Sequence, residues 1–491
     1  MSKYISALIL FFTPISGKAQ TFSYSQNYLA NKTSACKIIG QVKNNIIVWY
    51  VSSEKYKKSV ILVYNNRMKL IKKVTTDILH SDIDPAASFY NSVDSFYVAY
   101  QYKKGNKWEY KLAGFDNDGN LSSTYLIDSA SNLNSGDSLS YSFYQSGDKK
   151  TLGCVKTIMN KKYNAIRFEL TFLNDGNLYR DHFFLAFDNV HEKLVDLLID
   201  SNKTISLLKT SNTDSGFSIS LIKKEFSADH FLIATKKLAA GNLRNGTSHF
   251  FNRANSYTIY GIWENAFRDS LTRNQKYKTG LYTWKVDDKL ADMANDSILY
   301  DDSTTISEYN LYASNSLTNK PNNFFGIQTD SINISNQYAI PPTSMLVYTN
   351  FGTTGTWYYN YIDSNTSLEP PVSHYKASLT IISLNNNDNM EWRIELKNDR
   401  DSVFLNDPSN NKIVAGKKGI HIIRSTTIKK TRNSIKHILI TYSGRYEKVN
   451  TVVWNNKYSY LVSQAVETND GALIIPCLKD NRLIFARMIL E

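Results

Sequence analysis

Cysteine is scarce in this sequence, and no long apolar run occurs after its first residues. Only three cysteines are present among 491 residues, at Cys36, Cys154 and Cys477. None stands in a CxxC spacing, which excludes a thioredoxin-type redox motif and a zinc knuckle. Beyond the N-terminal segment, no stretch approaches the roughly 20 apolar residues that a membrane helix needs. The sequence therefore predicts a chain that does not span a membrane.

Signature motifs of catalysis are absent as well. The sequence has no GxSxG nucleophile elbow, no HExxH zinc helix, no P-loop and no GxGxxG. Glycoside cleavage needs two carboxylates at a defined separation, but the 44 acidic residues supply too many pairs to select one. No catalytic residue and no metal ligand is predicted, so the sequence favours a non-catalytic protein over an enzyme.

The first residues have the pattern of an export signal. Lys3 precedes the short apolar run YISALILFF, and small residues follow up to Ala19. A basic start, a short apolar run and small residues before the cut are typical of a secretory signal peptide. We expect residues 1–19 to be removed and the protein to be periplasmic or at the cell surface. The new first residue would be Gln20 rather than cysteine, so no lipid anchor is expected.

Charge is unevenly spread along the chain, whose formal net charge is +13. Acidic residues crowd the stretch 287–308, and basic residues crowd the stretch 397–448. A solvated lysine-rich surface is the simplest explanation of the basic stretch. The alternative is contact with an anionic glycan, a lipid surface or an acidic protein. Nucleic acid is not expected as a partner, because an exported protein seldom meets it.

One short phrase occurs twice, as FDNDGNL at 115–121 and as FLNDGNL at 172–178. Asp-Gly between two apolar runs indicates a hairpin, because its turn needs positive φ. Similar polar turns between apolar runs recur at Asn65-Asn66, Ala228-Asp229, Asp287-Asp288, Asn387-Asp388 and Ser443-Gly444. Apart from one longer interval these turns are about 55 residues apart, and a fixed period of this length indicates a repeat protein.

Each interval contains two more strand candidates before its hairpin, so the repeating unit has four strands. Such a unit matches one blade of a β-propeller, and a single blade cannot bury both of its faces alone. We therefore predict an all-β chain in which residues 20–491 form a single β-propeller of four-stranded blades. Eight blades are favoured and seven are the alternative. An array of two-sheet sandwiches is the competing fold.

The predicted ring would be closed by one blade that contains strands from both ends of the chain. Three strand candidates follow the last repeated turn, and TFSYSQNYL at 21–29 would supply the fourth. A disulfide between Cys36 in the first unit and Cys477 in the last is a candidate link across this junction.

Two features of the sequence fit the propeller prediction less well. Pro476 lies inside an apparent strand, which demands an edge or a bulge, and residues 303–345 lack periodicity, which predicts a long irregular insertion.

The segment ETNDGALIIP at 467–476 is similar to the Asp-Gly-Gly-apolar-apolar-x-Gly phrase of secreted bacterial β-propeller repeat proteins. Ala472 and Pro476 stand where that phrase has glycine. The resemblance covers this phrase and the general rhythm of the strands. It implies a propeller fold and an exported location, and it brings no catalytic residue with it.

The best candidate binding residues are aromatic. In the segment TWYYNYI at 356–362, Trp357, Tyr359 and Tyr361 would share one face of a strand. Rings on an exposed face stack sugars or grip a partner chain, and packing between blades is the alternative.

Asp-rich turns raise the alternative of calcium binding. Asp116 and Asp118 are spaced as at the start of many calcium loops, but the later bidentate acid of such loops is missing. A plain hairpin turn is therefore favoured there, and the acidic residues of 287–302 are the better cation candidates. No cofactor is predicted, with calcium as the alternative.

These features favour an exported, non-catalytic binding or scaffold protein of the bacterial periplasm or cell surface, in contact with an envelope protein or a polysaccharide. One alternative is a secreted glycan-degrading hydrolase or lyase with its site at a mouth of the propeller channel. Another is an accessory subunit of an outer-membrane export or adhesion complex. The oligomeric state is left open.

Overall fold

The computed structural model describes most of the chain from residue 22 onward. The described residues are 22–25, 33–52, 59–78, 88–104, 107–130, 137–146, 148–160, 165–174, 176–188, 191–213, 216–238, 242–243, 249–253, 256–268, 275–301, 308–313, 323–332, 375–384, 390–397, 411–415, 418–428, 432–449, 458–479 and 482–490. They are almost entirely β-strand, with one short 3-10 helix, η4 (Val462–Gln464). The predicted signal peptide, residues 1–19, lies outside them.

The described strands form eight antiparallel sheets, numbered here in chain order. Sheet 1 contains β2 (Thr33–Val42), β3 (Asn45–Ser52), β4 (Ser59–Asn65) and β5 (Leu70–Thr76). Sheet 2 contains β6 (Ser88–Asn91), β7 (Ser95–Lys104), β8 (Lys107–Asp116) and β9 (Leu121–Ala130). Sheet 3 contains β10 (Asp137–Gln145), β11 (Thr151–Asn160), β12 (Ala165–Asn174) and β13 (Asn177–Ala186). Sheet 4 contains β14 (Glu192–Ile199), β15 (Ile205–Thr213), β16 (Gly216–Lys224) and β17 (Leu232–Leu238).

The second half of the chain continues in the same way. Sheet 5 contains β18 (Asn242–Leu243), β19 (His249–Arg253), β20 (Ser256–Arg268), β21 (Gln275–Asp287) and β22 (Asp292–Asp301). Sheet 6 contains β23 (Glu308–Ala313), β24 (Asn323–Ile332), β25 (Tyr375–Leu384) and β26 (Met390–Lys397). Sheet 7 contains β27 (Asn411–Ala415), β28 (Gly419–Ile428), β29 (Arg432–Thr441) and β30 (Tyr446–Val449). Sheet 8 contains β1 (Phe22–Tyr24), β31 (Tyr458–Tyr460), β32 (Val466–Glu467), β33 (Ala472–Lys479) and β34 (Arg482–Ile489).

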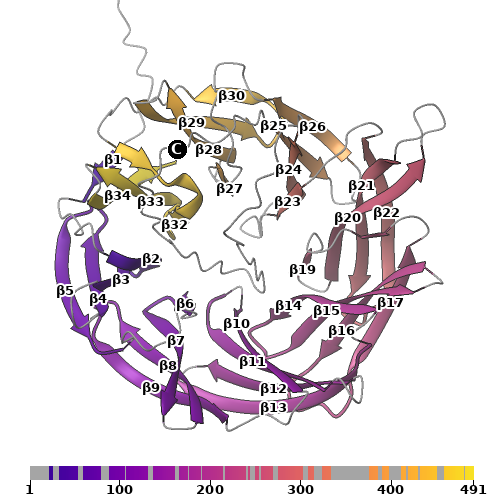
Figure 1. Cartoon of the computed structure of the whole chain (residues 1–491), viewed down its shortest axis with the longest axis horizontal. Coiled ribbons are helices and arrows are strands. Elements are labelled where there is room, and N and C mark those ends of the chain that lie inside the picture. The colour runs from indigo at the N-terminus through magenta and orange to yellow at the C-terminus, as the bar shows by residue number, and fades with distance from the viewer. Residues whose placement is uncertain are drawn as a thin grey trace, which may run out of the picture.

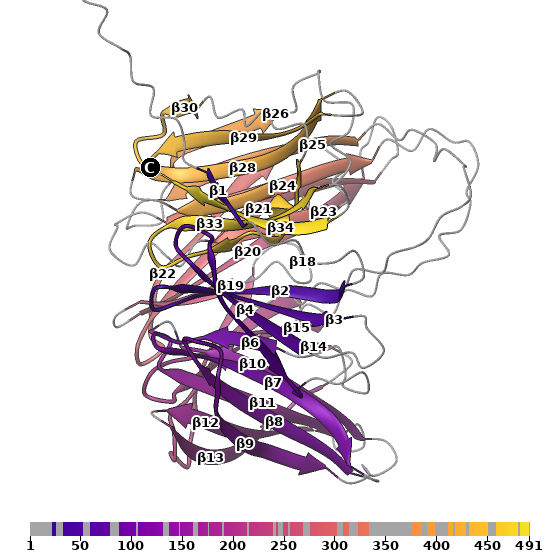
Figure 2. The ribbon, with the colours of Figure 1, turned by 90° about the vertical axis from the view of Figure 1, so that its left-hand side faces the viewer.

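The sheets follow one another around a common centre (Figure 1). In sheet 1, for example, β2 lies nearest the centre and β5 lies at the periphery, and the side view shows sheets 1, 2 and 3 next to one another (Figure 2). Four-stranded antiparallel sheets arranged radially in this way are a β-propeller. The predicted all-β class and four-stranded repeating unit are confirmed, and paired sandwiches do not fit this arrangement.

The hydrophobic core lies between neighbouring sheets, because each strand alternates its side chains between two faces. In β12, Ile166, Phe168 and Phe172 are buried against sheet 4. Comparable buried clusters join sheets 1 and 2, 2 and 3, 4 and 5, 6 and 7, and 7 and 8. A further cluster joins sheet 8 to sheet 1, where Ile474 and Phe485 pack with side chains of β2, β3 and β4. Each described sheet interface is therefore a separate small core.

The N-terminal strand completes the last sheet, as its sequence predicted. β1 pairs antiparallel with β34, with Phe22 opposite Met488 and Tyr24 opposite Ala486. The Tyr24 ring stacks on Tyr458 with 4.7 Å between centroids, and its hydroxyl lies 2.8 Å from the hydroxyl of Tyr460. Segments from the two ends of the sequence thus share one sheet.

The structure describes parts of the two irregularities that the sequence indicates. Of the region 303–345, predicted as an irregular insertion, residues 308–313 and 323–332 are strands of sheet 6, and the other residues between 302 and 345 lie outside the described part. Pro476 is neither at a sheet edge nor in a bulge. It lies in β33, which pairs on one side with two short strands, β31 and β32, separated by η4. Pro476 lies opposite this interruption, so its missing N–H removes no hydrogen bond between strands there.

A five-residue turn of one geometry recurs between paired strands. Its first residue accepts a backbone hydrogen bond from the fourth and donates one to the fifth, and the fourth has positive φ. The first residues of these turns are Asn65, Asp116, Asp200, Asp287, Thr441 and Thr468. In the second turn, Oδ1 of Asp116 accepts bonds from the N–H groups of Asp118 and Asn120 at 2.9 and 2.8 Å. The predicted Asp-Gly hairpin is confirmed, with the positive φ at Gly119.

Candidate functional site

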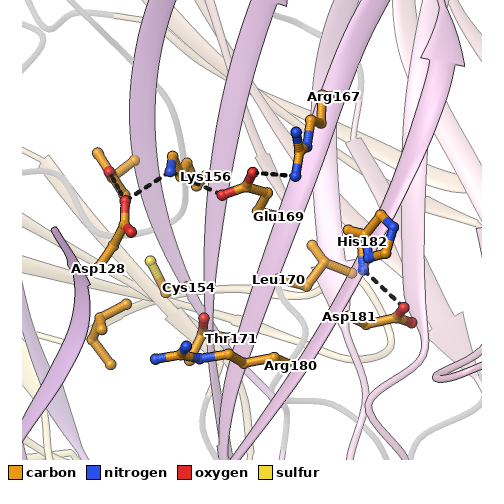
Figure 3. A pocket seen from close by; sticks show the side chains of 12 residues that line it. Asp128, Cys154, Lys156, Arg167, Glu169, Leu170, Thr171, Arg180, Asp181 and His182 are labelled. Carbon is orange, nitrogen blue, oxygen red and sulfur yellow. Dashed lines mark hydrogen bonds and ion pairs between the residues drawn. The ribbon is translucent and has the colours of Figure 1, made fainter. Parts of the chain in front are cut away.

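A cleft of about 300 Å³ lies between sheets 2 and 3 (Figure 3). Its lining is mostly polar, and three cationic and three acidic side chains contribute to it. The lining residues are Ile127, Asp128, Tyr141, Cys154, Lys156, Arg167, Glu169, Leu170, Thr171, Arg180, Asp181 and His182. Most of them come from the four strands of sheet 3.

The polar lining follows from the pattern of β12, AIRFELTFLN. Alternate residues Ile166, Phe168 and Phe172 face the core shared with sheet 4. Because successive side chains of a strand point to opposite faces, Arg167 and Glu169 face sheet 2 instead. A charged face toward a neighbouring sheet is what separates the sheets locally and leaves a cleft.

One row of side chains crosses all four strands of sheet 3. Tyr141 in β10 is opposite Lys156 in β11, Lys156 is opposite Glu169 in β12, and Glu169 is opposite His182 in β13. The Nζ of Lys156 lies 2.8 Å from a carboxylate oxygen of Glu169. The guanidinium of Arg167 lies 2.8 Å from the other oxygen of that carboxylate. Glu169 is therefore held between two cations (Figure 3).

Asp128 in β9 brings sheet 2 into this network. Lys156 Nζ lies 2.8 Å from its Oδ2, and the Tyr141 hydroxyl donates a hydrogen bond to the same oxygen. The Tyr141 ring also stacks on Tyr110 of sheet 2, with 3.5 Å between centroids. Lys156 thus bridges one carboxylate from each of the two sheets, and it fastens them together across the cleft.

The protonation states in this network are fixed by burial and by these bonds. Burial alone would raise the pKa of Asp128, but its hydrogen bonds from Lys156 and Tyr141 outweigh burial and lower that pKa. Burial, followed by the bond to Asp128, raises the pKa of Tyr141. The two carboxylates raise the pKa of Lys156 against the effect of its own burial. At neutral pH Asp128 is therefore an anion, Tyr141 is neutral and Lys156 is a cation.

The outer rim of the cleft presents an exposed aromatic ring beside cationic and polar groups. Phe184 in β13 is 59% exposed, and the guanidinium of Arg167 lies over its ring, 5.6 Å from the centroid. His182 meets the same ring edge-on at 6.4 Å. Arg180 is exposed as well. This combination of a flat ring and hydrogen-bond donors suits a sugar or a polar peptide segment.

Asp181 lies at the other side of the rim and is held by sheet 4. Its carboxylate accepts hydrogen bonds from Lys224 Nζ at 2.9 Å and from the backbone N–H of Ser227 at 3.0 Å. These bonds and that from the His182 N–H outweigh burial and lower the pKa of Asp181. Asp181 therefore positions the rim rather than offering a free acid.

The residues predicted from the sequence do not meet at this cleft. Trp357, Tyr359 and Tyr361 lie outside the described residues. The disulfide considered between Cys36 and Cys477 is not formed in this structure, where both are free thiols and belong to different core clusters. Burial raises the pKa of the Cys36 thiol to about 12. Cys154, also a free thiol, is buried beside the cleft.

The Asp-rich turns use their carboxylates internally. Asp116 accepts bonds from its own turn, and Asp287 Oδ1 accepts the N–H groups of Lys289 and Ala291 at 2.9 and 2.7 Å. Asp292 bonds to Lys236 and to the indole of Trp284. Within the described ranges, no group of three or more His, Cys, Asp or Glu side chains could hold a metal ion.

The cleft residues were not predicted, although one signal for them is in the sequence. The alternation in AIRFELTF indicates a strand with one polar face, but it does not show whether that face lies against solvent or against another sheet. Where charged residues alternate with apolar ones in a strand that has neighbours on both sides in its sheet, the charged face indicates a polar gap between two blades. What the sequence does not supply is the partner across the gap, Asp128, which is 28 residues from Lys156 along the chain.

Among the described residues, no helix is long and apolar enough to cross a membrane.

No family model matches this sequence, and no curated protein is similar to it. Among solved structures, the β-propeller domain of a Vanderwaltozyma polyspora nucleoporin is similar, with 11% identity and a TM-score of 0.36 over 79% of this chain and 97% of that one. The β-propeller domain of the trilobed protease from Pyrococcus furiosus has 8% identity and a TM-score of 0.34 over 82% and 93% of the two chains. Prolyl oligopeptidase B from Galerina marginata has 10% identity and a TM-score of 0.36 over 94% of this chain and 55% of its own. Similarities this distant assign no activity to this chain.

Proposed function

We propose that this chain is an exported, non-catalytic binding or scaffold protein built on one closed propeller of eight blades. The observation that carries the proposal is the cleft between sheets 2 and 3. Its rim offers an exposed ring and cationic donors, whereas the acids within it are already bonded to cations. The groups at the rim can hold a ligand, whereas the acidic groups within the cleft are engaged in ion pairs that join the sheets.

Ring closure is supported by contacts between the last sheet and the first. The eighth sheet takes β1 from the N-terminal segment and shares a hydrophobic cluster with sheet 1. The backbone N–H of Asn469 in sheet 8 also donates to Gln41 Oε1 in sheet 1 at 2.9 Å. Eight blades follow if the eight described sheets complete the ring.

Export rests on the first 19 residues, which have the pattern of a signal peptide. The proposal places the mature protein, residues 20–491, in the periplasm or at the cell surface. N-terminal sequencing of protein recovered from its native host checks this. A mature chain that starts at Gln20 supports export, and a chain that keeps Met1 contradicts it.

An envelope polysaccharide or envelope protein is the partner that suits the rim. Planar rings stack on sugars, and guanidinium and imidazole groups bond to hydroxyl and carboxylate groups. A glycan hydrolase would instead need a protonated carboxyl group to act as the general acid. In this cleft the pKa of Asp128 is lowered, which favours binding over cleavage.

The test compares cleft variants in a binding assay. Residues 20–491 are immobilised and incubated with purified envelope polysaccharide and, separately, with solubilised envelope proteins. We expect Phe184→Ala and Arg167→Ala to reduce the retained partner at least tenfold. Ile71→Ala, which removes an exposed side chain of sheet 1, serves as the control and should retain it. Equal retention by all variants, or release of shortened glycan during incubation, would overturn the proposal.

A further inference from the structure

The acidic and cationic side chains that line the cleft between sheets 2 and 3 are equal in number, but one of the acids takes its partner from elsewhere. Asp181 is paired with Lys224 Nζ at 2.9 Å. Lys224 is buried in β16 of sheet 4 and does not belong to the lining. The lining therefore carries one more cation than its remaining acids balance.

The other two acids of the lining engage two of its three cations. Lys156 Nζ lies 2.8 Å from a carboxylate oxygen of Asp128 and 2.8 Å from one of Glu169. The guanidinium of Arg167 lies 2.8 Å from the other oxygen of Glu169. The remaining cation is Arg180 of β13, whose side chain has no ion pair or hydrogen bond within the described ranges.

The position of Arg180 in sheet 3 brings its charge into the cleft. It lies opposite Thr171 of β12, and its side chain runs past Thr171 with no dashed line at its guanidinium (Figure 3). Arg180 is exposed as well as part of the lining. A ligand can therefore bind this guanidinium without first breaking a bond inside the protein.

Arg180 belongs to a row of three ligand-binding candidates on β13. Residues two apart on a strand share a face, so Arg180, His182 and Phe184 point to the same side. The Cα atoms at the two ends of the row are about 13 Å apart along the strand, which rises about 3.3 Å per residue. A single sugar ring is shorter than that, so a ligand that meets both Arg180 and Phe184 has more than one unit.

We propose that the cleft selects an acidic polysaccharide, in which Arg180 binds the carboxylate of a uronic acid unit and Phe184 stacks on a neighbouring sugar. The inference rests on the binding role proposed above for the cleft, and it names the class of ligand. A guanidinium forms two parallel N–H···O bonds with a carboxylate, which a neutral sugar cannot replace. An acidic peptide also carries carboxylates, but an exposed flat ring beside polar groups suits a sugar face better.

Calorimetry with charged and uncharged forms of the same sugars tests the selection. Hexasaccharides of galacturonate and of mannuronate, and their carboxyl-reduced forms, are titrated into residues 20–491 at pH 7 and constant ionic strength. We expect at least one acidic hexasaccharide to bind tenfold or more tightly than its reduced form. A hexapeptide of glutamate, the probe for an acidic peptide, should bind more weakly than that hexasaccharide.

Two arginine variants separate the role of Arg180 from general attraction to a basic protein. Arg180→Gln should abolish the preference, so that the acidic and reduced forms bind equally. Arg67→Gln is the matched control, because it removes the same charge from an exposed arginine in the turn between β4 and β5, and it should keep the preference. A wild-type urea midpoint of Arg180→Gln checks that this variant folds.

Phe184→Ala distinguishes failure of this inference from failure of the binding role. It should weaken the acidic and the reduced form by the same factor, because the ring does not sense the carboxylate. If it does so while Arg180→Gln keeps the preference, the cleft binds glycan without selecting charge, and only this inference fails. If neither variant changes any titration, both fail. Equal affinity for the two forms in the wild type, loss of the preference in Arg67→Gln, or tighter binding of the peptide would also overturn the inference.

Discussion

Two buried histidines make the stability of sheet 7 depend on pH. His421 in β28 and His437 in β29 are 1% and 3% exposed, and Nδ1 of His421 lies 2.8 Å from Nε2 of His437. Their rings stack with 4.9 Å between centroids. Burial lowers the pKa of each to about 4, from 6.5, and nearby positive charge on Lys418 or on the other histidine adds to the effect.

The sign and size of the effect follow from linkage. Between pH 6.5 and pH 4 the unfolded chain binds more protons at these histidines than the folded protein does, so stability falls as pH falls through this window. From pH 7 to pH 5 each histidine accounts for a loss of about 2 kcal/mol. The pair together accounts for about 4 kcal/mol, which is a large share of a typical folding free energy.

Urea unfolding followed by tryptophan fluorescence at pH 7, 6 and 5 measures this loss. The double variant His421→Phe with His437→Phe keeps two flat rings in the core and removes both titrating groups. We expect its stability to fall by about 4 kcal/mol less than that of the wild type over the same range. His182→Asn, which changes an exposed histidine, should keep the wild-type slope. Equal slopes in the wild type and the double variant would refute the reasoning.

Three substitutions test the packing by urea unfolding. Gly419→Ala would place a Cβ 2.1 Å from the carbonyl oxygen of Ile440, so we expect a loss of about 3 kcal/mol, and an unchanged midpoint would contradict that close approach. Lys156→Met leaves Asp128 and Glu169 without their shared cation, and a loss of about 2 kcal/mol is expected; the loss should be smaller in the triple variant that also carries Asp128→Asn and Glu169→Gln. Tyr24→Ala removes the ring that stacks in sheet 8 and the hydroxyl that meets Tyr460, and should cost about 2 kcal/mol. A Tyr24 variant as stable as the wild type would show that β1 adds nothing to sheet 8.

Much of the fold could be predicted because similar turn residues recur once in each repeating unit. Asp-Gly at Gly119 and Ser-Gly at Gly444 mark positions where φ is positive and glycine fits. The same turn with Lys203 or Leu290 at its fourth position has no such mark, because these residues accept positive φ at some energetic cost. The first residue of the turn, Asn, Asp or Thr, is the more general signal, since its side chain bonds to the backbone of the turn.

The candidate site could not be predicted from the sequence, and the reason is physical. Asp128 and Glu169 meet at Lys156 only because two sheets pack face to face with a particular register. Strand alternation predicts which side chains share a face, but it does not predict which strand lies opposite.

The pairing of β1 with β34 has a consequence for the order of folding. Sheet 3 forms from consecutive strands, and its pairings join residues near one another in the chain, whereas Phe22 pairs with Met488. Closing a long loop costs more entropy than closing a short one, and such pairings form slowly. We expect sheet 8 to be completed last. Until then the edge of β34 is open to the first strand of another copy, so refolding at high concentration should yield dimers that exchange residues 22–24.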